Sequence, residues 1–108
     1  MKYFLIEGIV NNPDKINDLI MKEHQNYTKK AMEDGLILIS SLKSDMTASV
    51  TIAKSINYDT IKLFYENEPF FKQGILTYNI SELDIQYHYQ NIEKWFDEFV
   101  KPQSEVQK

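Results

Sequence analysis

Residues 3–35, YFLIEGIVNNPDKINDLIMKEHQNYTKKAMEDG, contain a strand pattern and a helix pattern separated by a short polar turn. Residues 3–10 are rich in β-branched and aromatic side chains, which predicts a β-strand. Asn12 then suits the N-cap of a helix, and Pro13 suits its first turn. Apolar side chains recur at helical spacing until Gly35, whose tolerance of the left-handed conformation predicts the end of the helix.

The next segment carries the signals of a hairpin and a second helix. Residues 36–42 form a short apolar run of strand length, and residues 46–54 follow a polar turn as the expected partner strand. Asn57 repeats the N-cap pattern and opens a helix that we expect to reach about residue 67. Pro69 is expected to end that helix, because the residue before a proline is disfavoured in the helical conformation.

The last third predicts one long strand and one amphipathic helix. Residues 75–87 read as a strand whose alternation changes phase at residues 81–82, which predicts a bulge or bend there. Residues 89–100 have apolar side chains on one helical face. We therefore expect a single domain over residues 1–100 and a flexible tail over residues 101–108.

The predicted order is β-α-β-β-α-β followed by a terminal helix. This order is that of the ferredoxin-like split βαβ fold, an α+β architecture with a four-stranded antiparallel sheet and both crossover helices on one side. The other side of the sheet then needs cover. The last helix could supply part of it, and a second subunit facing sheet to sheet would supply it more completely.

Composition narrows the class of protein. The 108 residues suffice for one domain, and the absence of cysteine excludes disulfides and cysteine-type zinc sites and fits a cytoplasmic location. The start of the chain does not resemble a signal peptide, and no apolar run approaches the roughly 18 residues of a membrane helix. A net charge of −4 argues against a nucleic-acid partner. We expect no cofactor, because the three glycines form no phosphate-binding loop.

Two residues are candidates for chemistry. His24 lies at the border of the apolar stripe of the first helix, where it would act as a general acid or base or be a half-buried histidine with one satisfied hydrogen bond. Glu68 precedes Pro69, where it would orient His24 or be a solvated acid beside Glu66. His88 is expected at the surface or in a dimer contact, and the two histidines lack the i, i+4 spacing of a metal site.

Three further residues could bind a substrate. Tyr27 lies one helical turn after His24, where its hydroxyl would hold a substrate oxygen or close the edge of the core. Ser41 ends an apolar strand and could hydrogen-bond a ligand. Phe70 belongs to an aromatic group near the second helix that would suit a planar ligand.

Several short motifs keep a common spacing over residues 1–87. They are His24-x-x-Tyr27 with Gly35 eleven residues after the histidine, Asn57-Tyr58-Asp59-Thr60-Ile61, and Glu68-Pro69-Phe70 with Gly74-Ile75 after it. In this combination the chain resembles the YciI-like family. Glu68 stands where that family has an aspartate, and Ser41-Leu42 stand where it often has Gly-Pro.

The resemblance implies a dimeric α+β barrel of ferredoxin-like subunits with a site built on a histidine and a carboxylate, here His24 and Glu68. One class of similar proteins eliminates chloride from hydroxylated, chlorinated aromatics. Three interpretations follow: a cofactor-independent lyase or isomerase, a dimeric module that binds a small molecule or docks on a partner protein without catalysis, and a structural dimer. In the last of these, the C-terminal helix contacts another subunit through Trp95.

Overall fold

A computed structural model describes residues 1–97 of the chain. The predicted tail over residues 101–108 and the last residues of the predicted C-terminal helix lie outside that range. The described elements, in chain order, are β1 (Lys2–Val10), the 3-10 turn η1 (Pro13–Lys15), α1 (Asp18–Glu33), β2 (Ile37–Leu42), β3 (Ala48–Ser55), α2 (Tyr58–Glu66), α3 (Pro69–Lys72), β4 (Leu76–Leu83) and α4 (Ile92–Asp97).

Within residues 1–97, four strands form one antiparallel sheet in the order β2-β3-β1-β4. The first and third strands lie in the centre, and each crossover helix connects a central strand to an edge strand. This order confirms the predicted ferredoxin-like α+β fold.

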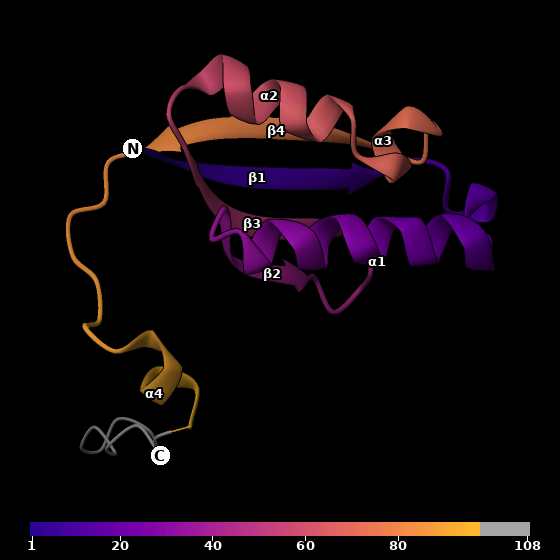
Figure 1. Cartoon of the computed structure of the whole chain (residues 1–108). Helices are drawn as coiled ribbons and strands as arrows, with labels where there is room; N and C mark the ends of the chain where they lie inside the picture. The colour runs from indigo at the N-terminus through magenta and orange to yellow at the C-terminus, as the bar shows by residue number, and fades with distance from the viewer. Residues whose placement is uncertain (98–108) are drawn as a thin grey trace.

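Both long helices cover the same face of the sheet (Figure 1). Phe4 and Ile6 of β1 are buried in one cluster with Ala31 of α1 and Ile61 of α2. Side chains two positions apart on a strand share a face, so a single row of β1 contacts both helices. The opposite face of the sheet is left without a helix layer in the described part of the chain.

The first helix begins later than the sequence predicts. Asn17, not Asn12, is the N-cap of α1, and its side chain accepts a hydrogen bond from the Ile20 amide at 2.9 Å. Asn12 instead donates from Nδ2 to the Gly74 carbonyl at 2.8 Å, which ties the loop after β1 to the loop before β4. The prediction for Gly35 is confirmed, since its φ of 79° places it in the left-handed region.

The second helix is capped by Asn57 as predicted, because its side chain accepts from the Thr60 amide at 2.8 Å. The expected role of Pro69 was wrong in part. α2 already ends at Glu66, and Pro69 is the first residue of the separate short helix α3. A proline at the first helical position costs no hydrogen bond, since that amide has no partner within a helix.

The fourth strand is shorter than predicted, and its register with β1 runs without a break to Leu83. No bulge lies at residues 81–82. The irregularity in the sheet is in β2, between Ile37 and Ile39. Residues 84–91 follow β4 without regular structure, and α4 then lies apart from the sheet (Figure 1).

Candidate active site

His24 and Glu68, which are 44 positions apart in the sequence, meet where α1 packs on α3. The distance from His24 Nδ1 to Glu68 Oε2 is 2.5 Å. A carboxylate oxygen only accepts hydrogen bonds, so this contact favours the tautomer with the proton on Nδ1. The other ring nitrogen, Nε2, is then the one available to exchange a proton.

Glu68 is buried, with 1% of its surface exposed. Its second oxygen, Oε1, accepts hydrogen bonds from the Phe70 amide at 3.0 Å and from the Tyr78 hydroxyl at 2.8 Å. The expectation of a solvated acid beside Glu66 was therefore wrong. Glu68 is the N-cap of α3, and the same carboxyl group caps that helix and contacts the imidazole.

The imidazole of His24 is held by packing as well as by Glu68. Ile20 and Met21 of α1 pack against a buried cluster that includes Phe70 and Leu76. The His24 ring stacks on Phe70 with its centroid 3.8 Å from that of the phenyl ring and with 3° between their planes. About a quarter of the histidine side chain, 27%, remains exposed. The ring is thus fixed in direction while one edge stays accessible.

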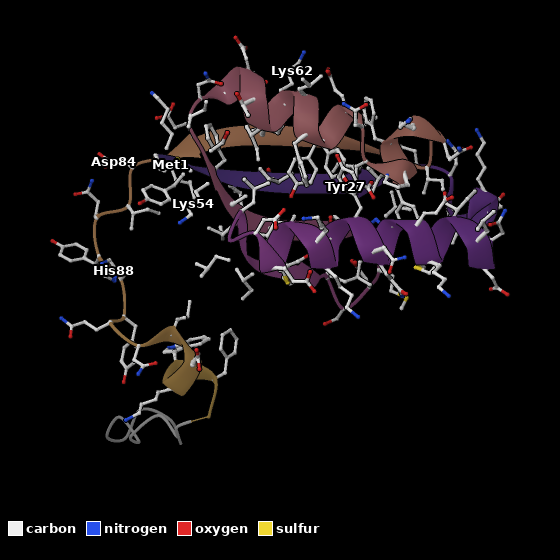
Figure 2. The ribbon with its side chains drawn as sticks, viewed as in Figure 1. Met1, Tyr27, Lys54, Lys62, Asp84 and His88 are labelled. Carbon is white, nitrogen blue, oxygen red and sulfur yellow. The ribbon has the colours of Figure 1, made fainter. Side chains whose placement is uncertain are left out.

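The two other predicted substrate-binding residues are committed to backbone hydrogen bonds. Tyr27 extends from α1 toward α2 (Figure 2), and its hydroxyl donates to the Phe64 carbonyl of that helix at 2.6 Å. Ser41 donates to the Val50 carbonyl at 2.7 Å across the β2–β3 hairpin. The structure therefore brings His24, Glu68 and Phe70 into mutual contact, with Tyr27 and Ser41 at the borders of the neighbouring cavities.

Two cavities adjoin the histidine. A small one of about 50 Å³ is lined by side chains of α1, α2 and the sheet, and a larger one of about 470 Å³ opens between α1 and the β2–β3 hairpin. His24, Ser40 and Ser49 line both. Among the described residues that line the larger cavity, His24 is the only one with an ionisable side chain, and most of the others are apolar. This lining suits a neutral, largely apolar molecule that carries hydrogen-bonding oxygens.

Tyr78 of β4 also holds Glu68, and it was not among the site residues predicted from the sequence. One signal could have found it, since Leu76, Tyr78 and Ile80 alternate along the strand and therefore share the face that the helices cover. Gly8 of β1 makes room for this ring. A Cβ atom at Gly8 would lie 2.5 Å from Ser49 Oγ and 3.1 Å from Tyr78 Cε1, so any larger residue would displace a side chain of the site.

Three tyrosines at the site have a raised pKa. Burial is the main cause for Tyr27, Tyr65 and Tyr78, and the charge of Glu68 adds to it. Tyr78 also donates its hydroxyl proton to Glu68, which raises its pKa further. All three phenols are therefore protonated, and able to donate, throughout the neutral range.

These raised values predict a loss of stability at alkaline pH. The folded state favours protonated phenols, so their contribution to stability is complete below the unfolded-state pKa of about 10 and falls as the pH rises above it. Tyr65 and Tyr78, whose pKa is raised most, should thus ionise only as the chain unfolds, and tyrosinate absorbance and circular dichroism should report one shared transition. In Tyr78→Phe, that shared transition should contain one tyrosine fewer. Reversible ionisation of all the tyrosines in the folded chain would contradict this prediction.

Within residues 1–97, no group of three or more His, Asp or Glu side chains is placed to hold a metal ion. No helix in the same range is long and apolar enough to cross a membrane.

No protein-family model and no curated protein sequence matches the chain. Among solved structures, the chain is similar to 5-chloro-2-hydroxyhydroquinone dehydrochlorinase (TftG) from Burkholderia phenoliruptrix AC1100, solved in complex with 2,5-dihydroxybenzoquinone. The TM-score is 0.64 at 20% sequence identity, and the match covers 76% of this chain and 93% of that one. At this identity the comparison shows a shared fold.

Proposed function

We propose that this chain is a cofactor-independent lyase of the YciI-like type that acts on a small, hydroxylated aromatic molecule. His24 exchanges the proton through Nε2, and Glu68 fixes the tautomer through Nδ1 and stabilises the imidazolium when it forms. The observation that carries the proposal is the 2.5 Å contact between His24 Nδ1 and the buried Glu68 carboxyl group, beside a largely apolar cavity.

The proposed chemistry balances without a cofactor. Loss of hydrogen chloride from a chlorinated trihydroxybenzene gives a hydroxyquinone, and no oxidant is needed because chloride leaves with the electron pair of the C–Cl bond. Two hydroxyl groups of the substrate lose their protons. One of these protons ends on the ring carbon that carried chlorine, and the other leaves with chloride as HCl. A single imidazole that both gives and takes protons can serve each transfer.

The choice of substrate class rests on the cavity and on the similar structure. The larger cavity has about 470 Å³, enough for one substituted ring, and its lining includes His24 and the Phe70 ring on which His24 stacks. The solved protein of similar fold is a dehydrochlorinase bound to a dihydroxyquinone. We therefore propose 5-chloro-2-hydroxyhydroquinone as the first test substrate.

The test is chloride release by the full chain. Wild-type protein should release chloride from 5-chloro-2-hydroxyhydroquinone faster than buffer alone, with one hydroxyquinone formed for each chloride. Other chlorinated di- and trihydroxybenzenes form the rest of the panel. If the protein binds these rings but releases no chloride from any of them, the second interpretation, a module that binds without catalysis, replaces the lyase.

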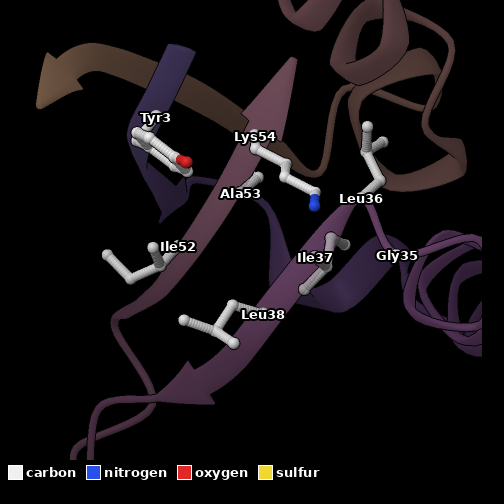
Figure 3. Close-up of a pocket in the computed structure, with 8 residues that line it drawn as sticks. All are labelled: Tyr3, Gly35, Leu36, Ile37, Leu38, Ile52, Ala53 and Lys54. Carbon is white, nitrogen blue, oxygen red and sulfur yellow. The ribbon is translucent and has the colours of Figure 1, made fainter. Parts of the chain in front are cut away.

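We further propose that the chain forms a cytoplasmic homodimer through the open face of the sheet. Tyr3, Leu38 and Ile52 line a hollow of about 300 Å³ there, and Figure 3 shows Tyr3 on β1, Leu38 on β2 and Ile52 on β3. Leu38 lies at the irregularity of β2 and is 58% exposed. A second copy would bury these side chains, as a sheet with one uncovered apolar face requires. A contact through the exposed Trp95 of α4 stays a prediction.

The proposed dimer interface can be tested with one variant and a matched control. Leu38→Asp should convert the protein to a monomer, because it places a charge in the proposed interface. Leu63→Asp changes a leucine of similar exposure, 61%, on α2, and should leave the dimer intact. Light scattering coupled to size-exclusion chromatography measures both masses. A monomeric wild-type chain, or a Leu38→Asp variant that dimerises as tightly as wild type, would contradict the proposed interface.

A further inference from the structure

The hydroxyl of Tyr65 is the unexplained group of this region. Tyr65 is only 5% exposed, and its hydroxyl oxygen has no hydrogen-bond partner among the described residues. Its ring packs against Phe64 and Tyr78, with centroids 5.0 and 4.6 Å away. Burial and the nearby charge of Glu68 raise the pKa of Tyr65, so the phenol keeps its proton. A buried donor without an acceptor is rare in folded proteins, which points to a missing partner.

Tyr65 lines the small cavity together with His24 and Glu68. Two hydroxyl groups on the sheet line the same space, where Thr51 Oγ1 donates to Ser40 Oγ at 3.3 Å. Ser40 accepts that bond and so keeps its own O–H to donate. The cavity therefore offers two O–H donors, one from Tyr65 and one from Ser40. The carboxyl group of Glu68 beside them disfavours an anion, so the fitting partner is a neutral oxygen.

The volume of the cavity limits what this partner can be. About 50 Å³ is enough for one water molecule, which occupies roughly 30 Å³ in the liquid, and too little for an aromatic ring. The larger cavity shares His24, Ser40 and Ser49 with the small one. A ring in the larger cavity could therefore extend a single substituent past His24 toward Tyr65.

We propose that the small cavity is a subsite for one neutral oxygen atom, which accepts a hydrogen bond from the Tyr65 hydroxyl next to His24. This oxygen belongs either to an ordered water molecule or to a carbonyl or hydroxyl substituent of the bound ligand. The ligand alternative rests on the proposed function, because it takes the larger cavity as the place of the substrate ring. The water alternative does not.

The test compares Tyr65→Phe with Tyr58→Phe in the full chain. Tyr58→Phe is the matched control, because Tyr58 is 43% exposed and its ring merely packs near Phe4. Three measurements are made: the melting temperature, the Kd of hydroxyhydroquinone, the neutral and unchlorinated form of the test substrate, by calorimetry, and crystal structures of wild type with and without that ligand. Removing a satisfied buried hydroxyl lowers the melting temperature, whereas removing an unsatisfied one leaves it unchanged or raises it.

Each source of the oxygen predicts its own result. A water molecule predicts density within hydrogen-bond distance of the Tyr65 hydroxyl in the unliganded crystal, a melting temperature ~4 °C lower in Tyr65→Phe, and an unchanged Kd. A ligand oxygen predicts a Kd about tenfold weaker in Tyr65→Phe and ligand density in the subsite. In either case Tyr58→Phe behaves as wild type.

One combination of results would exclude the proposed subsite. If Tyr65→Phe melts at or above the wild-type temperature, binds hydroxyhydroquinone unchanged, and the cavity holds no density in either crystal, the subsite does not exist. If wild type does not bind hydroxyhydroquinone at all, the proposed substrate class fails, and the water density and melting temperature still decide the subsite.

Discussion

Replacing His24 with alanine is expected to reduce kcat/KM for chloride release by about 10²–10⁴-fold, the usual range for the loss of a general acid or base. The chain should still fold, because the histidine side chain is partly exposed and lies at the edge of the core. The loss should therefore appear in turnover while the circular dichroism spectrum stays that of wild type.

The second histidine of the chain provides the control for this result. His88 is exposed, follows β4, and hydrogen-bonds to the neighbouring Tyr89 carbonyl at 3.3 Å. His88→Ala should therefore retain wild-type turnover. A folded His24→Ala variant with unchanged chloride release would remove His24 from the mechanism.

Replacing Glu68 with alanine is expected to lower the free energy of unfolding by about 3–5 kcal/mol, because each donor that loses its acceptor in the folded protein costs about 1–3 kcal/mol. The change leaves three groups without their acceptor: His24 Nδ1, the Phe70 amide and the Tyr78 hydroxyl. Urea denaturation followed by circular dichroism measures the loss, provided the slope of the transition is unchanged.

Glu66→Ala is the matched control for this loss of stability. It removes an acid only two positions away, whose side chain is 42% exposed and pairs with Lys62 at 3.1 Å. A surface pair of this kind contributes little to stability, so Glu66→Ala should stay close to wild type. If Glu68→Ala were no less stable than Glu66→Ala, the buried carboxyl group would not hold this part of the structure together.

Local signals in the sequence were enough for the order of elements. The caps at Asn57 and Gly35 are set by neighbouring residues, and both are confirmed. Asn12 and Asn17 show the limit of such signals. Both precede a stretch that can form a helix, and only tertiary contacts decide between them, because Asn12 is used to hold the Gly74 carbonyl.

The end of β4 was also beyond local reasoning. Residues 84–87 continue a strand pattern, but pairing with β1 stops at Leu83, opposite Tyr3 near the start of that strand. A strand without a partner cannot satisfy its backbone hydrogen bonds within a sheet, whatever its composition. The pattern of side chains therefore overestimated the strand by several residues.

The candidate site also combines features that local sequence predicts with features that only tertiary contacts decide. His24 could be selected for its chemistry and its place on the helix, but nothing local to Glu68 predicts that it is buried. Its burial depends on α3 packing against α1 and on Tyr78 reaching it from β4. The pairing of His24 with Glu68 came from the resemblance to the YciI-like family, and the coordinates place those two side chains in contact.

The most direct test of the account is a comparison of kcat/KM for chloride release among His24→Ala, Glu68→Gln and the double variant. Two residues that act as one unit lose their effect together, so the double variant should be no slower than His24→Ala, within about threefold. If the two single losses multiply in the double variant, His24 and Glu68 act independently, and a coupled pair is not the catalytic centre.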